Sequence, residues 1–256
     1  MSTSSILIFL RSTLFYIVLI IFTVVFSTSC KIISPAMSYR TRFRFIIQGY
    51  TGFITQWLRI CCGVDYQVTG TENIPDTPCI IASNHQSTWE TFFLQTRFAP
   101  QTQVVKKELL SIPFFGWILS LTNPVAIDRN NRKQAMKQIL MQGREKLRRG
   151  IWVLIFPEGT RVNPGQTKCF SKGAAALAIH AGVPVLPVAH NAGEHWPNNG
   201  YMKYPGTIKV VYGPLIQSDN KTTEELTRET EQWIGNKVRE IGNQPIHKEG
   251  IVPLQP

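Results

Sequence analysis

The segment that decides the fold is Cys79-Ile80-Ile81-Ala82-Ser83-Asn84-His85-Gln86-Ser87-Thr88-Trp89-Glu90. Its first five residues form an apolar run that predicts a buried strand, and a helix is expected over residues 87–97. Functional groups of open α/β sheets commonly lie where a strand ends. A histidine at that place, with a carboxylate in reach, can act as a general base. We therefore interpret His85 as a base and Glu90 as the group that orients its ring.

The spacing of this pair restricts its geometry. Five helical residues turn through about 140° beyond a full circle, so the two side chains would not share a helix face. His85 must then lie in the loop before the helix, with Glu90 in the first turn reaching back. Ser87 and Glu90 also fit a capping box, so the alternative is that Glu90 only caps the helix. The alternative for His85 is a buried histidine with satisfied hydrogen bonds.

A second segment, Phe156-Pro157-Glu158-Gly159-Thr160-Arg161, follows the apolar run Trp152-Val153-Leu154-Ile155. A glycine permits a tight turn, and the planar guanidinium of Arg161 suits phosphate. The alternative is an ordinary turn with a solvated arginine. Lys106 and Arg129 are further candidate phosphate ligands, although a solvated surface charge is the alternative for each. Lys172 and Gly173, which come after this turn, are weaker candidates.

These segments resemble the first and third motifs of the glycerolipid acyltransferases. Pro124-Val125-Ala126-Ile127-Asp128-Arg129 resembles the second motif, and Val183-Pro184-Val185-Leu186-Pro187-Val188 resembles the fourth. The order and rough spacing of the four motifs also match those of the family, and the resemblance extends from about residue 70 to residue 213. The family usually has aspartate where this chain has Glu90. Either carboxylate can accept a hydrogen bond from imidazole, but the extra methylene changes its reach.

The resemblance implies transfer of an acyl chain from a thioester of CoA or acyl carrier protein to the sn-2 hydroxyl of 1-acylglycerol 3-phosphate. It also implies that Glu158, Gly159, Thr160 and Arg161 bind the acceptor. The alternatives are an acyltransferase for another lysolipid or for glycerol 3-phosphate, and a non-catalytic protein that binds membrane lipids. The His85–Glu90 pair argues against the last, because a scaffold needs no base.

Other sequence features exclude some chemistries. Gly-x-Ser-x-Gly is absent, so we expect direct attack by the acceptor rather than an acyl-enzyme. No cofactor is expected beyond the thioester co-substrate. His190 and His195 are not part of an HExxH motif, and no metal site is predicted. The five cysteines are odd in number and lack a CxxC pair, so neither a disulfide framework nor a zinc site is expected.

The chain of 256 residues carries a net charge of +11. Such a charge favours anionic partners, here the head groups of membrane lipids and phosphorylated substrates. The sequence shows no zinc-finger spacing and no aromatic RNA-binding motif, so nucleic acid is not an expected partner.

The N-terminal segment is apolar. Between Arg11 and Lys31 there is no charged residue, and a membrane-crossing helix needs roughly 20 apolar residues. More basic residues follow this run than precede it, which predicts a cytoplasmic catalytic domain on a membrane, the inner membrane of a bacterium. The alternative is a signal peptide cleaved before Cys30.

Residues 43–62 predict an amphipathic helix, which either lies in the membrane interface or packs on the domain. The other expected strands are residues 66–70, 103–105, 125–127, 152–156, 183–189 and 207–212. The other expected helices are a short one after residue 112 and residues 131–149, 172–181 and 223–241. Alternating strands and helices indicate a single α/β catalytic domain with a largely parallel mixed sheet flanked by helices. The predicted organisation is an anchoring segment at 1–62, a catalytic domain at 63–243 and a flexible tail at 244–256.

Overall fold

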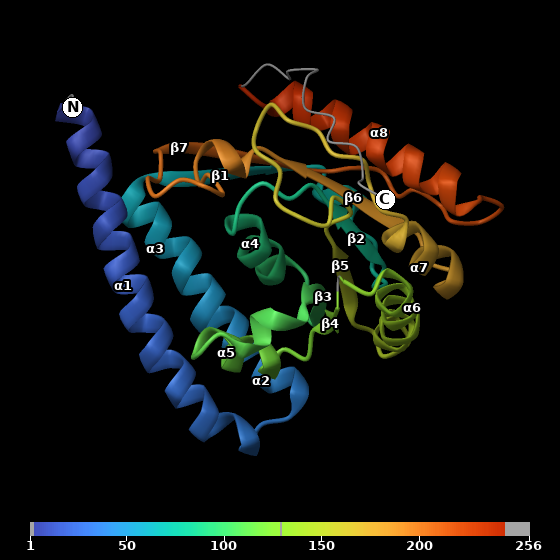
Figure 1. Ribbon diagram of the computed structural model, residues 1–256, viewed down its shortest axis with the longest axis horizontal. Helices are drawn as coiled ribbons and strands as arrows, with labels where there is room; N and C mark the ends of the chain where they lie inside the picture. Colours follow the sequence, from blue (N-terminus) through green and yellow to red (C-terminus); the bar gives the residue numbers. More distant parts are fainter. Residues whose placement is uncertain (1–2, 129, 244–256) are drawn as a thin grey trace.

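The structure, a computed structural model, describes residues 3–128 and 130–243. The predicted tail and Arg129 therefore lie outside the described residues. The centre of the protein is a seven-stranded sheet in the order β1-β7-β6-β2-β5-β3-β4 (Figure 1). Neighbouring strands are parallel except β6 and β7, which are antiparallel. The predicted α/β fold with a largely parallel sheet is confirmed.

Every predicted strand is present, with its ends shifted by no more than two residues. Apolar runs identified the central strands β2 and β5, which are buried throughout because a parallel strand is covered on both faces. The edge strand β1 was predicted from its alternating pattern instead. The strands are β1 (Val64–Thr69), β2 (Ile80–Ser83), β3 (Gln101–Lys106), β4 (Val125–Ile127), β5 (Trp152–Ile155), β6 (Val185–His190) and β7 (Gly206–Tyr212).

Helices cover both faces of the sheet, because side chains of successive strand residues point to opposite faces. Ile80 and Ala82 of β2 pack in one apolar cluster with α6 (Arg132–Arg148), α7 (Gly173–Ala181) and α8 (Thr223–Ile241). Ile81, between them, belongs to the cluster on the opposite face, with α4 (Trp89–Arg97) and the N-terminal helices. A short helix, α5 (Phe115–Leu121), lies at the end of that face.

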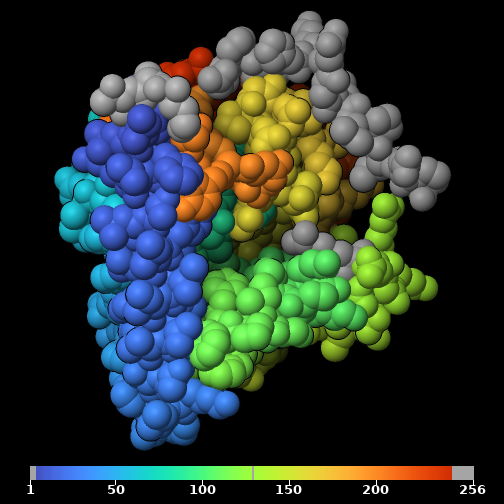
Figure 2. Space-filling model, turned by 60° about the vertical axis from the view of Figure 1, so that its left-hand side comes forward, coloured from blue at the N-terminus to red at the C-terminus, as the bar shows by residue number. Residues whose placement is uncertain are grey.

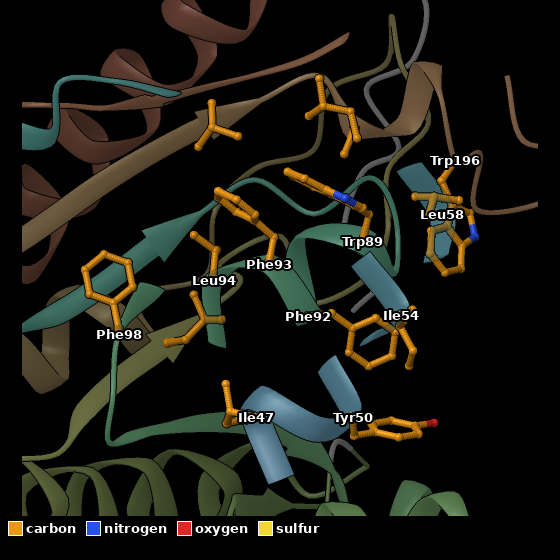
Figure 3. Close-up of a cluster of buried hydrophobic side chains, with 14 of the residues drawn as sticks. Ile47, Tyr50, Ile54, Leu58, Trp89, Phe92, Phe93, Leu94, Phe98 and Trp196 are labelled. Atoms are coloured by element: carbon orange, nitrogen blue, oxygen red, sulfur yellow. The ribbon is translucent and has the colours of Figure 1, made fainter. Parts of the chain in front are cut away.

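The predicted amphipathic helix consists of three elements in direct succession: α2 (Tyr39–Ile46), a π-helical turn (Ile47–Thr51) and α3 (Gly52–Cys62). It packs on the domain through buried residues that include Phe43, Tyr50, Ile54 and Leu58. Figure 3 shows Tyr50, Ile54 and Leu58 beside the aromatic side chains of α4. On the outer side, Ile60 is exposed beside the polar Gln56 and Arg59, so the helix is a core element whose outer face is largely polar.

The N-terminal helix α1 (Thr3–Ile33) lies along one side of the molecule, in blue in Figure 2. It is long and apolar enough to cross a membrane. Phe15 contacts the ring of Trp196 edge-on, and Phe26 stacks on Phe45 near the opposite end of the helix. Its outward apolar side chains are exposed: Ile6, Leu7, Leu10, Leu14, Ile17, Ile21 and Val25. Thus α1 combines a face packed on the domain with a face that no described residue covers.

Candidate active site

The loop that carries His85 is fastened to the end of β6. Asn84 Nδ2 donates to the carbonyl oxygen of His190 (2.9 Å), and the His190 amide donates to Asn84 Oδ1 (3.0 Å). The His190 ring lies 2.8 Å from the Asn84 carbonyl through Nε2, and its Nδ1 accepts from the Ala192 amide. These contacts assign the proton to Nε2, and burial lowers the pKa of His190. His190 thus holds the loop in place as a neutral ring.

The predicted pairing of His85 and Glu90 is present. His85 Nδ1 lies 2.8 Å from Glu90 Oε1. The same oxygen accepts from the amides of Gln86 (2.9 Å) and Ser87 (2.8 Å). One oxygen thus both contacts the ring and satisfies amides before the helix. The predicted capping box is only half formed, because Ser87 Oγ accepts from the Trp89 amide and the N-cap residue is Thr88. The helix itself begins at Trp89, because the chain still turns at Ser87 and Thr88.

Glu90 is completely buried. Burial by itself raises the pKa of a carboxyl group, but hydrogen bonds from His85 and the Ser87 amide help to outweigh it, and the pKa of Glu90 is lowered. The carboxylate is therefore ionised at neutral pH and acts as an acceptor. Its partner ring nitrogen, Nδ1 of His85, must then carry the proton, which leaves Nε2 unprotonated in the neutral ring.

His85 borders a cavity of about 190 Å³. Its ring stacks on Phe156 with 4.0 Å between centroids, and its side chain is only 14% exposed, so the imidazole is shielded on one face. The cavity brings together three of the predicted binding residues, Lys106, Gly159 and Arg161. They come from the ends of β3 and β5; β5 lies beside β2 in the sheet, and β3 is the next strand along.

The turn at Gly159 is tied to the His85 loop by two hydrogen bonds, one between backbone groups and one to a side chain. The Val162 amide donates to the His85 carbonyl (2.7 Å), and the His85 amide donates to Glu158 Oε2 (2.7 Å). Gly159 has φ +70°, a conformation that glycine adopts without strain. The carboxyl of Glu158 lies behind the loop, in a neighbouring hollow next to α8. Burial raises the pKa of Glu158 to about 8.

The remaining predicted residues lie at the edges of this site. Thr160 is exposed and does not line the cavity. Lys172 forms an ion pair with Glu224, while Gly173 lines the cavity. Arg129 is outside the described residues. In residues 3–128 and 130–243 there is no cluster of side chains that could hold a metal ion.

A second, apolar cavity of about 430 Å³ adjoins the first. The two share Thr88, Phe92 and Phe115 in their walls. The outer wall of the second cavity comes from Tyr16 and other residues of α1. An apolar route thus leads from the exposed N-terminal helix to the neighbourhood of His85.

A family model described as Acyltransferase matches residues 65–191, the stretch that contains the His85–Glu90 pair and the Gly159 turn. The protein is thus an acyltransferase. A 1-acyl-sn-glycerol-3-phosphate acyltransferase of Pseudomonas aeruginosa is 49% identical over 91% of both chains. A Saccharomyces cerevisiae protein of the same name is 30% identical over 79% of this chain and 72% of its own. The chain belongs to the 1-acyl-sn-glycerol-3-phosphate acyltransferase family.

A solved structure agrees with this assignment. The crystal structure of the 1-acyl-sn-glycerophosphate (LPA) acyltransferase from Thermotoga maritima matches with a TM-score of 0.74 and 27% sequence identity. The match covers 91% of this chain and 95% of that chain.

Proposed function

We propose that the protein transfers an acyl chain from a thioester of CoA or acyl carrier protein to the sn-2 hydroxyl of 1-acylglycerol 3-phosphate. His85 Nε2 takes the hydroxyl proton as the oxygen attacks the thioester carbonyl carbon. The tetrahedral intermediate then loses the thiolate, and the imidazolium returns the proton to the sulfur. The products are phosphatidic acid and a free thiol. Glu90 keeps the ring in the required tautomer and stabilises the imidazolium.

The observation that carries this proposal is the position of His85 at one cavity together with two cationic side chains, Lys106 and Arg161. Lys106 and Arg161 line the cavity that His85 borders, so an acceptor phosphate held by them brings the rest of the molecule to the base. Arginine offers a fork for two phosphate oxygens, and lysine offers a point charge. Gly159 leaves open space beside the turn, since no atom lies within 4 Å of where a Cβ would be.

The adjoining apolar cavity supports a lipid substrate. Acyl chains of donor or acceptor find there an apolar wall from α1, Phe92 and Phe115.

We also propose that α1 lies lengthwise in the cytoplasmic leaflet of the membrane, the bacterial inner membrane. The domain packs along α1 from Ser12 to Phe26, so α1 has little free length with which to cross alone. Anionic lipids are the expected partners of a chain with a net charge of +11.

The test of the reaction is thioester release by the purified full-length enzyme with a panel of acceptors. Release of thiol with 1-acylglycerol 3-phosphate, but not with glycerol 3-phosphate or 1-acylglycerophosphocholine, is the expected result. Preference for either of the other acceptors would replace the proposed substrate. No thiol release with any acceptor would favour a lipid-binding protein. Acyl-CoA and acyl carrier protein donors are compared in the same assay.

Arg161→Lys tests the phosphate contact. The substitution keeps the charge and removes the fork, so we expect the KM for 1-acylglycerol 3-phosphate to rise on the order of tenfold, equivalent to about 1.4 kcal/mol. The KM for the thioester should stay near its wild-type value. Initial rates with each substrate varied in turn give both constants. Equal increases in both would contradict a phosphate contact.

The membrane placement is tested on the exposed face of α1. Replacing Leu10, Ile17 and Ile21 with glutamine removes apolar surface that is exposed in the protein. Because burial of each such side chain is worth about 1.5–3 kcal/mol, binding to anionic vesicles should fall by well over tenfold. Met141→Gln on α6, a residue 62% exposed, is the control and should float with vesicles as wild type does. Unchanged flotation of the α1 variant would disprove the placement.

A further inference from the structure

The connection between β6 and β7 forms a closed loop, residues 195–204. The Tyr204 amide donates to the His195 carbonyl at its base (2.8 Å). The loop lies between two functional parts of the molecule, the helix α1 and the turn that carries Arg161. In Figure 2 the orange segment near residue 200 lies directly beside the upper part of α1.

A buried lysine attaches this loop to α1. Lys203 is only 1% exposed, and its ammonium donates to Tyr16 Oη (2.7 Å) and to the Tyr201 carbonyl (2.8 Å). It also lies over the rings of Tyr16 (4.6 Å) and Trp196 (5.3 Å). The Lys203 amide donates to Ser12 Oγ (2.8 Å). Burial lowers the pKa of Lys203 to about 8.

Aromatic contacts reinforce this attachment. The ring of Tyr201 stacks on Tyr16 of α1 at 5.1 Å, and its hydroxyl donates to Thr13 Oγ1 (2.9 Å). At the start of the loop, Trp196 meets Phe15 of α1 edge-on at 5.2 Å. A loop bound at both ends to one rigid helix has little freedom to move independently of it.

The tip of the same loop contacts the candidate phosphate ligand. Arg161 Nη1 donates to Asn198 Oδ1 at 3.2 Å. In the described parts of the chain, no other side chain forms a hydrogen bond with Arg161. An arginine at the surface has several rotatable bonds, and holding it in one orientation lowers the entropy lost when it binds. Asn198 also lines the apolar cavity beside α1.

We propose that Asn198 is a positioning residue for Arg161 and that Lys203, by holding the loop on α1, makes the membrane helix a structural part of the acceptor site. The inference rests on the proposed binding of the acceptor phosphate by Arg161. In this arrangement α1 does more than anchor the enzyme. Its position is transmitted through Lys203, the loop and Asn198 to the guanidinium.

Asn198→Ala in the full-length enzyme tests the first half. The KM for 1-acylglycerol 3-phosphate should rise about threefold to tenfold, with kcat and the KM for the thioester unchanged. The matched control is Asn236→Ala, because Asn236 accepts a hydrogen bond from Arg239 on α8, a bond of the same type away from the cavity. The double variant Arg161→Ala/Asn198→Ala should have the acceptor KM of Arg161→Ala alone.

The outcomes separate this inference from the proposed function. If Arg161→Ala raises the acceptor KM and Asn198→Ala does not, the positioning role is wrong and the phosphate contact stands. If Arg161→Ala itself has no effect on the acceptor KM, the phosphate contact fails first. Independent, multiplicative effects in the double variant would also overturn the positioning role.

Lys203→Met tests the connection to α1, with thermal unfolding measured on the same samples. A folded Lys203→Met enzyme should show the acceptor KM of Asn198→Ala, and combining the two should add nothing. A normal acceptor KM would show that α1 does not influence the site. If Lys203→Met does not fold, Tyr201→Phe decides, since it removes only the bond to Thr13. Tyr201→Phe should then raise the acceptor KM about twofold or more, and an unchanged value would overturn the connection.

Discussion

His85→Ala should lower kcat by a factor on the order of 10² to 10⁴, the usual contribution of a general base. His85 is the ring that borders the cavity, with Nδ1 bound to Glu90 and Nε2 left to take a proton. Without the ring, the acceptor hydroxyl attacks the thioester unaided. The KM values should change little, because neither proposed phosphate ligand is altered.

The measurement is steady-state thiol release, with circular dichroism and a melting curve on the same protein. His180→Ala is the control, because His180 is exposed on α7 and should leave kcat unchanged. A correctly folded His85→Ala enzyme with near wild-type turnover would remove His85 from the mechanism.

Glu90→Gln should also lower kcat strongly, toward the loss of about 10⁴ that the same kind of substitution causes in Ser-His-Asp enzymes. The amide oxygen can still accept from Gln86 and Ser87, so the loop remains supported. The NH₂ group takes the place of Glu90 Oε2, an atom without a hydrogen-bond partner in the described residues. A neutral amide cannot stabilise the imidazolium, so turnover should suffer more than stability.

The stability of this variant should also depend differently on pH. The pKa of Glu90 is lower in the folded protein than the ordinary value of 4.5. Its contribution to stability is therefore present above about pH 4.5 and is lost as pH falls through the folded pKa. Glu90→Gln should be less stable at neutral pH and should lose less stability on acidification.

Melting curves from pH 7 to pH 3, compared with those of the exposed control Glu240→Gln, give this result. Wild-type kcat combined with reduced stability would mean that Glu90 only caps the helix.

Much of the fold follows from local patterns. Apolar runs predicted the buried central strands, and alternation predicted β1, because both patterns depend on neighbours in the sequence. The His85–Glu90 contact could be predicted for the same reason, since the pair is five residues apart. The start of the helix at Trp89 could not be predicted in this way. The carboxylate of Glu90 accepts from the amides of Gln86 and Ser87 and at the same time holds the ring of His85.

The rest of the site depends on which strands are neighbours. His190 supports the His85 loop from 106 residues away, only because β6 pairs with β2. Sequence reasoning considered His190 only as a metal ligand. The signal available was a histidine at the end of a strand, the same signal that identified His85. The placement of Glu158 behind the loop, and the contact of Asn198 with Arg161, likewise require the three-dimensional arrangement.

The attachment of α1 to the domain has a consequence for synthesis of the chain. Tyr16 is translated early, but its partner Lys203 comes 187 residues later. Contacts so distant in sequence form late, because closing a long loop costs entropy before any contact forms. During that interval the apolar faces of α1 have no protein partner, and exposed apolar segments are prone to aggregation. A lipid surface that receives α1 while the ribosome is still translating would protect it until the last strand is made.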